Sequence, residues 1–124
     1  MRRVAAVRHE AAPRQITIGN PHTVREFLHA EDVAAAYVSL AAHGTSGEVY
    51  NVCSGHGVTV EALAREVCAR AGVDADLVSH PSLRRTIDVP WLVGDNTKLR
   101  STTGWAPHRS RSDIIDELLH AASH

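Results

Sequence analysis

One segment near the middle of the sequence has every local signal of an amphipathic helix. Thr59 can cap a helix over Val60–Arg70, because a threonine hydroxyl accepts a hydrogen bond from a free N–H of the first turn. Gly72 suits the left-handed conformation that ends many helices. The inward-facing side chains would be Leu63, Val67 and Cys68. The helix must bury this apolar face, so the segment requires a packed core around it.

Helical and strand-like segments alternate along the rest of the chain, and glycine or proline stands at most of the breaks. Further helices are predicted over Arg2–Glu10, Glu31–Ala42, Asn96–Thr102 and Arg111–Ala122. Short extended segments are predicted over Gln15–Ile18, Thr23–Leu28, Glu48–Cys53 and Asp76–Ser79, the third of them as a buried strand. The alternation predicts an α/β fold, a small mixed domain of helices and short strands.

The length and composition favour one small globular domain over residues 1–124. The chain is 44% hydrophobic and 22% charged, which allows one modest core. A formal charge of −1 gives no general attraction for nucleic acid or an anionic membrane. No apolar run approaches the roughly 20 residues that span a bilayer, and the amino-terminal segment is too charged for a secretory signal. We therefore expect a cytoplasmic location.

Neither cysteine nor histidine forms a recognisable metal or redox pattern. Cys53 and Cys68 are not a CxxC pair and are expected to be buried free thiols. The nine histidines are scattered, so no metal site is expected. Thr59–Val73 also resembles the opening of a helix-turn-helix, but its glycine follows the alanine by about two helical turns where the motif needs about one. A DNA-binding module is therefore not favoured.

Several uncommon residues occur in a fixed order along most of the chain. They are Gly19-Asn20, Arg25, Asp32, Tyr50-Asn51-Val52, Ser54-Gly55, Arg85, Gly94-Asp95, Lys98, Gly104-Trp105 and Pro107. In order and spacing this series resembles the carboxy-terminal part of the extended short-chain dehydrogenase/reductases of the NAD-dependent epimerase/dehydratase family. Within them it most resembles the GDP-mannose 4,6-dehydratase and GDP-6-deoxy-hexose reductase group. The resemblance implies the substrate-binding part of a Rossmann-type enzyme.

By this resemblance, Arg25 and Arg85 reach the diphosphate of a bound nucleotide sugar. A guanidinium suits phosphate because its planar fork of N–H donors can make two charge-assisted bonds. Without the resemblance, Arg25 would be interpreted as an exposed strand residue paired with Glu26 or Glu31. Arg84 adjoins Arg85, and either of the two arginines could face the ligand.

Two further residues belong to the site that the resemblance implies. Asn20 could bond a sugar hydroxyl or a phosphate, although Gly19-Asn20-Pro21 is also typical turn chemistry. Asp88 would lie near the nucleotide end, or else be a solvated loop carboxylate. Lys98 and Trp105 are expected to be structural, with Trp105 packing the last turn against the final helix.

The hydride chemistry of this family requires features that these 124 residues do not show. The family holds NAD or NADP on a glycine-rich loop and uses a tyrosine with lysine at the fourth position after it. Tyr37 and Tyr50 are followed there by Ala41 and Ser54, and the loop around Gly55-His56-Gly57 lacks a third glycine. We expect no catalytic residue, no bound cofactor, and no activity of the chain alone.

Three interpretations follow. The chain is a truncated piece of a nucleotide-sugar lyase or oxidoreductase that is inert alone, or it is a GDP-mannose-type binding module that works with a separate Rossmann-half chain. The third interpretation is a non-catalytic structural or oligomerisation module. The two arginines favour the first two. We also expect a homo-oligomer, because the predicted strand over Glu48–Cys53 would expose its edges.

Overall fold

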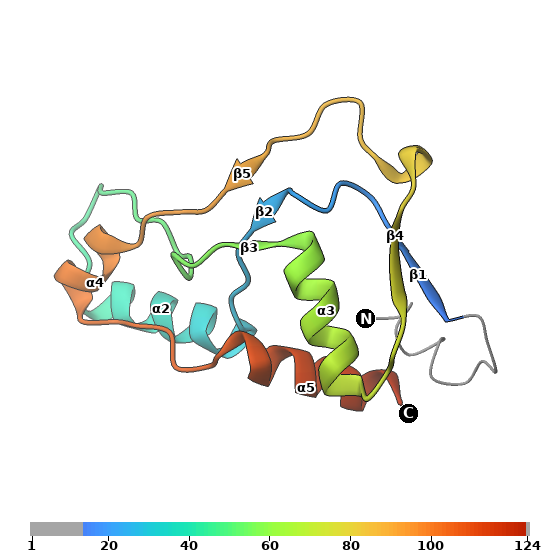
Figure 1. Ribbon diagram of the computed structural model, residues 1–124. Coiled ribbons are helices and arrows are strands. Elements are labelled where there is room, and N and C mark those ends of the chain that lie inside the picture. Colours follow the sequence, from blue (N-terminus) through green and yellow to red (C-terminus); the bar gives the residue numbers. More distant parts are fainter. Residues whose placement is uncertain (1–13, 124) are drawn as a thin grey trace. The chain divides into compact units, whose positions relative to one another are not determined.

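A computed structural model describes residues 14–123 (Figure 1), so the predicted helix over Arg2–Glu10 lies outside the described residues. The chain divides into two compact units. The first unit contains the described residues up to Arg25, Val58–Trp91 and the residues from Ile115 onward; the second contains Glu26–Gly57 and Leu92–Ile114. Each unit has its own apolar cluster. That the chain acts as a single domain stays a prediction.

The first unit pairs two strands in parallel and covers them with helices. Strand β1 (Gln15–Ile18) pairs with β4 (Asp76–Ser79), with Ile16 opposite Leu77. Helices α3 (Val60–Ala71) and α5 (Arg111–Ala122) supply most of the remaining apolar side chains, and Val73 follows α3. The buried cluster consists of Ile16, Val67, Cys68, Ala71, Val73, Ile115 and Leu119. These four elements confirm the predicted helices and strands at these positions.

The two ends of α3 have the predicted caps. The Thr59 side chain accepts a hydrogen bond from the Ala62 N–H at 3.1 Å. Gly72 adopts a φ of 67°, a conformation that glycine takes without steric cost. The Gly72 N–H donates to the Ala69 carbonyl at 3.2 Å and the Val73 N–H to the Cys68 carbonyl at 2.9 Å, which satisfies carbonyls of the last turn.

A second, three-stranded sheet has the order β3-β2-β5 (Figure 1). Strand β2 (Val24–Arg25) pairs antiparallel with β3 (Val58–Thr59), and the third strand is β5 (Trp91–Leu92). The Val24 N–H donates to the Pro90 carbonyl at 2.9 Å. Strand β2, over Val24–Arg25, is shorter than the predicted extended segment over residues 23–28. The 3₁₀ helix η1 (Pro81–Leu83) follows β4.

The second unit is built on helices α2 (Ala30–His43) and α4 (Thr97–Thr103), both predicted. Its buried cluster is Ala36, Leu99 and Trp105. The Trp105 indole also donates from Nε1 to the Asp32 carbonyl at 3.0 Å. Trp105 is thus structural, but the prediction that it packs against the final helix is wrong: its partners in the cluster come from α2 and α4.

No strand forms over residues 48–53, contrary to the prediction of a buried strand there. Side-chain donors take two of its carbonyls: Asn96 Nδ2 donates to Cys53 O at 2.9 Å, and Lys98 Nζ donates to Val49 O at 2.9 Å. Val49 is 79% exposed. Backbone carbonyls that accept hydrogen bonds from side chains do not require pairing with a neighbouring strand. The expected homo-oligomer, which rested on this strand's edges, stays a prediction without that support.

Asp32 has a role that the sequence analysis missed. Its side chain is buried, and its two carboxylate oxygens accept hydrogen bonds from the His108 and Arg109 N–H groups at 3.0 Å each. Asp32 was named from the sequence only as a member of the series of residues that carries the family resemblance. In the structure its carboxylate joins α2 to the chain segment that follows Trp105.

Cys53 and Cys68 are buried free thiols, as predicted. Within residues 14–123, no His, Cys, Asp and Glu side chains gather as a metal site would need. Over the same residues, no helix has both the length and the apolar character to cross a membrane.

Both thiols are expected to react slowly with a thiol reagent in the folded protein. Burial raises the pKa of Cys53 and of Cys68, so less of the reactive thiolate forms near neutral pH, and the reagent also has poor access. A reagent that releases a chromophore when it reacts with a thiol would be used, and the absorbance of that chromophore would be followed with and without denaturant. The native rate should rise with pH, and both thiols should react at once when unfolded. Fast reaction in the native state would contradict their burial.

Candidate functional site

The four predicted ligand-binding residues line one cavity in the first unit. Its volume is about 220 Å³, and its walls are Gly19, Asn20, Thr23, Arg25, Val60, Leu83, Arg85 and Asp88. These residues come from the turn before β2, from β2 itself, from the start of α3, and from the segment between β4 and β5. Thr23 and Asp88, which lie 65 positions apart in the chain, are therefore brought together.

The turn before β2 forms one wall and depends on two residues. Asn20 Oδ1 accepts a hydrogen bond from the His22 N–H at 3.0 Å, which is the turn chemistry expected of an asparagine here. A Cβ atom at Gly19 would lie 2.8 Å from the Leu83 carbonyl oxygen, so only glycine allows this approach to η1. Asn20 therefore shapes the turn and also faces the cavity.

Arg25 is held by acceptors from two chain segments. Its Nη2 lies 2.9 Å from Asp88 Oδ1, and its Nη1 donates to the Val24 and Val89 carbonyls at 2.7 Å each. Arg25 is thus paired with Asp88 and not with Glu26 or Glu31, the partners expected without the family resemblance. Three of the five N–H groups of the guanidinium are thereby used. Among the described residues, no acceptor takes the N–H on Nε or the second one on Nη2.

Asp88 is not a solvated loop carboxylate. Its side chain is 22% exposed, its Oδ1 accepts from Arg25, and its Oδ2 accepts from the Thr23 hydroxyl at 3.0 Å. Thr23 is 4% exposed and was not predicted to belong to the site. No sequence signal could have identified it, because only the pairing of β2 with the segment before β5 places it beside Asp88.

The two adjacent arginines have different surroundings. Arg84 Nη2 donates to the Ser79 hydroxyl at 3.2 Å, and Arg84 does not line the cavity. Arg85 lines the cavity, is exposed, and has no hydrogen bond or ion pair with the described part of the chain. Two guanidinium groups and one carboxylate give the cavity a formal charge of +1. Such a cavity can bind an anionic group of modest size.

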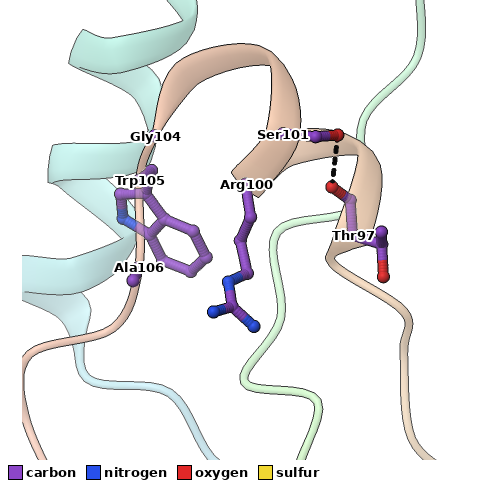
Figure 2. A pocket seen from close by; sticks show the side chains of 6 residues that line it. All are labelled: Thr97, Arg100, Ser101, Gly104, Trp105 and Ala106. Carbon is purple, nitrogen blue, oxygen red and sulfur yellow. Dashed lines mark hydrogen bonds between the residues drawn. The ribbon is translucent and has the colours of Figure 1, made fainter.

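A second hollow lies in the second unit and contains none of the predicted ligand-binding residues (Figure 2). Its volume is about 350 Å³, and it is lined by Thr97, Arg100, Ser101, Gly104, Trp105 and Ala106. The Ser101 hydroxyl donates to the Thr97 carbonyl at 2.7 Å (Figure 2), and the Trp105 ring is buried. Ser101 is thus bonded within α4, and Trp105 belongs to the buried cluster of this unit.

The loop around Gly55 does not fit a dinucleotide. In a dinucleotide loop, backbone N–H groups at the start of a helix face the pyrophosphate. Here the Gly55 N–H donates to the Glu26 carboxylate at 2.9 Å, and the Ser54 hydroxyl donates to the same oxygen at 3.3 Å. Strand β3 also separates this loop from α3. The two donors at Ser54 and Gly55 are already satisfied by a carboxylate of the chain itself.

Residues 1–118 match the family model described as GDP-mannose 4,6 dehydratase. The chain belongs to this family. Its members are NAD(P)-dependent dehydratases, reductases and epimerases of sugar nucleotides, and they belong to the extended short-chain dehydrogenase/reductases. The family resemblance inferred from the ordered residues is thereby confirmed.

Individual relatives agree with this assignment. The chain is 32% identical over 118 residues to a GDP-6-deoxy-D-mannose reductase of Pseudomonas aeruginosa, a match that covers 95% of this chain and 39% of the reductase. It is 30% identical over 101 residues to a dTDP-glucose 4,6-dehydratase of Streptomyces niveus, covering 82% of this chain and 30% of the dehydratase. The chain thus spans well under half the length of these relatives.

Solved structures confirm the fold class. The structure of RMD from Pseudomonas aeruginosa complexed with NADPH superposes with a TM-score of 0.87 at 27% identity, over 98% of this chain and 39% of that one. The UDP-glucose 4-epimerase of Thermotoga maritima with UDP-glucose gives 0.80 at 26% identity, over 96% and 37%. The small mixed α/β fold is therefore that of one part of an extended short-chain dehydrogenase/reductase.

Proposed function

We propose that the 220 Å³ cavity binds the diphosphate of a GDP-mannose-type nucleotide sugar, and that the chain is the substrate-binding part of a sugar-nucleotide dehydratase, reductase or epimerase. The observation that carries this proposal is the convergence of Asn20, Arg25, Arg85 and Asp88 on one cavity. The sequence relative from Pseudomonas aeruginosa is named for a GDP-sugar reaction, which supports the choice of nucleotide.

The donors in the cavity suit a diphosphate. Arg85 has its whole guanidinium to offer, and Arg25 offers one N–H on Nε and one on Nη2. Bonds from a guanidinium to phosphate oxygens are charge-assisted and can be bidentate, which lysine cannot reproduce. The diphosphate of a nucleotide sugar carries two negative charges. The cavity has a formal charge of +1 and therefore attracts it electrostatically.

The size of the cavity limits what it recognises. Small-molecule sites usually have volumes of about 300–1,000 Å³. At about 220 Å³ this cavity is smaller, so it accommodates the diphosphate and not a whole nucleotide sugar. We therefore expect weak binding of GDP-mannose by these residues alone.

The chemical step is not assigned to these residues. The loop at Gly55 is occupied by a carboxylate, and neither tyrosine has the lysine that the family's acid–base pair requires. We expect the chain alone to bind no NAD(P) and to show no dehydratase or reductase turnover. Turnover of a GDP-sugar by the pure chain would contradict this part of the proposal.

Arg85→Ala is expected to weaken the binding of GDP-mannose about tenfold or more. Each charge-assisted hydrogen bond contributes roughly 1.5–3 kcal/mol, and about 1.4 kcal/mol corresponds to a factor of ten. Amide chemical shifts of the labelled chain would be followed by NMR during titration with GDP-mannose, with UDP-glucose as the comparison. The wild-type chain should show shifts at cavity residues with GDP-mannose, and UDP-glucose, which carries the same diphosphate, tests whether the nucleotide adds selectivity.

Arg84→Ala is the matched control for this experiment. It removes the same charge from the adjacent position, but its guanidinium bonds to Ser79 and does not line the cavity. Its affinity should stay within about twofold of wild type, since a surface charge outside the contact contributes little. Equal losses in both variants would mean that net charge alone attracts the ligand. An unchanged affinity in Arg85→Ala would remove Arg85 from the site.

A further inference from the structure

The guanidinium of Arg25 is fixed before any ligand arrives. The carbonyls of Val24 and Val89 accept from Nη1 at 2.7 Å each, and they belong to two segments joined by the hydrogen bond from the Val24 N–H to Pro90. The position of Nη1 is therefore set by backbone pairing and not by flexible side chains. A guanidinium anchored in this way has one remaining edge to hold in place.

Asp88 holds that remaining edge, and Thr23 holds Asp88. Oδ1 of Asp88 accepts from Arg25 Nη2 at 2.9 Å, while Oδ2 accepts from the Thr23 hydroxyl at 3.0 Å. Thr23 is almost fully buried, and its carbonyl accepts from the Val60 N–H at 3.0 Å. The chain of contacts thus runs from the start of α3 through Thr23 and Asp88 to the arginine.

The same contacts immobilise the guanidinium of Arg25. Each oxygen of Asp88 accepts one hydrogen bond within the protein, Oδ1 from Arg25 and Oδ2 from Thr23. Fixing a long side chain in advance saves the affinity otherwise lost in immobilising it, about two- to tenfold for one such side chain.

We infer that Thr23 and Asp88 are positioning residues of the anion cavity, which act on the ligand by holding the guanidinium of Arg25 in place. The inference rests on the proposed function of the cavity for its effect on affinity, but the immobility of Arg25 can be measured without any ligand.

Thr23→Val and Thr23→Ser form the decisive pair. Valine keeps the shape of threonine and loses only the hydroxyl, whereas serine keeps the hydroxyl, and neither changes the charge of the cavity. Dispersed amide spectra would verify that both variants are folded. Without ligand, the guanidinium N–H signals of Arg25, identified by their loss in Arg25→Lys, should be resolved in the wild type and in Thr23→Ser. They should broaden or average in Thr23→Val.

Affinity for GDP-mannose provides the second readout. Thr23→Val should weaken binding about three- to tenfold, and Thr23→Ser should stay within about twofold of wild type. In an Arg25→Lys background the Thr23→Val change should have no further effect, because the double-mutant cycle removes any action that passes through Arg25. An equal loss on both backgrounds would overturn the inference, as would averaged Arg25 signals in the wild-type chain. If the wild type binds no GDP-mannose, the proposed function fails, while the ligand-free signals still decide whether Arg25 is held.

Discussion

Replacing Ile115 with alanine is expected to lower the free energy of unfolding of the first unit by about 2–5 kcal/mol. Ile115 is 1% exposed and belongs to the cluster that includes Ile16 and Val67. The change removes buried methyl and methylene groups and leaves a cavity that a close-packed interior fills only in part. Since a domain of this size is stable by about 5–15 kcal/mol, a large part of that stability would be lost.

Leu118→Ala on the same helix is the control for this prediction. Leu118 is 46% exposed, so its truncation creates little or no cavity and should cost less than about 1 kcal/mol. Both variants keep the good helix propensity of alanine, so the comparison isolates burial. Urea unfolding followed by far-ultraviolet circular dichroism would measure both. Equal shifts of the two midpoints would mean that α5 does not pack through the Ile115 face.

Replacing Asp32 with alanine should destabilise the second unit by about 2–4 kcal/mol, because two backbone N–H groups lose a charged acceptor in a poorly hydrated position. Those groups belong to His108 and Arg109, both at 3.0 Å from the carboxylate. Asp32→Asn should cost less, because the amide oxygen can still accept one of the two hydrogen bonds.

Glu31→Ala tests whether acidic charge at the start of α2 explains the effect. Glu31 is the adjacent residue, is exposed, and lies 3.6 Å from Arg109 as a surface ion pair. Such pairs contribute about 0–1 kcal/mol, so its loss should hardly move the unfolding midpoint. Similar losses at both positions would show that Asp32 acts through the helix dipole and not through the two N–H groups. The same denaturant series would be used for all three variants.

The parts of the fold that the sequence predicted well are those whose signals are local. Thr59 and Gly72 bound α3 because a hydroxyl cap and a left-handed glycine act within one turn of the helix. The same holds for Gly104, with a φ of 73° at the end of α4. The strand predicted over residues 48–53 does not form, because two of its carbonyls accept hydrogen bonds from the side chains of Asn96 and Lys98, which lie far along the chain.

The candidate site, like the fold, could be predicted from the sequence only in part. Arg25, Arg85, Asn20 and Asp88 were found through a family resemblance, and the structure places all four on one cavity. What no sequence pattern could supply is their mutual arrangement: which of two adjacent arginines faces the cavity, and which acceptor holds Arg25. Thr23 escaped notice because a buried threonine has no distinctive sequence context, and only its hydroxyl contact with Asp88 gives it a role.

The interleaving of the two units has a consequence for how the chain acquires its structure. The first unit is assembled from three stretches of chain and the second from two. The contact between Arg25 and Asp88 spans 63 residues, and that between Asp32 and His108 spans 76. Loops of this length must close before either contact forms, so folding should be slow for so small and so helical a chain. Neither unit can be obtained intact by a single cut, since each such cut separates stretches that complete the same cluster.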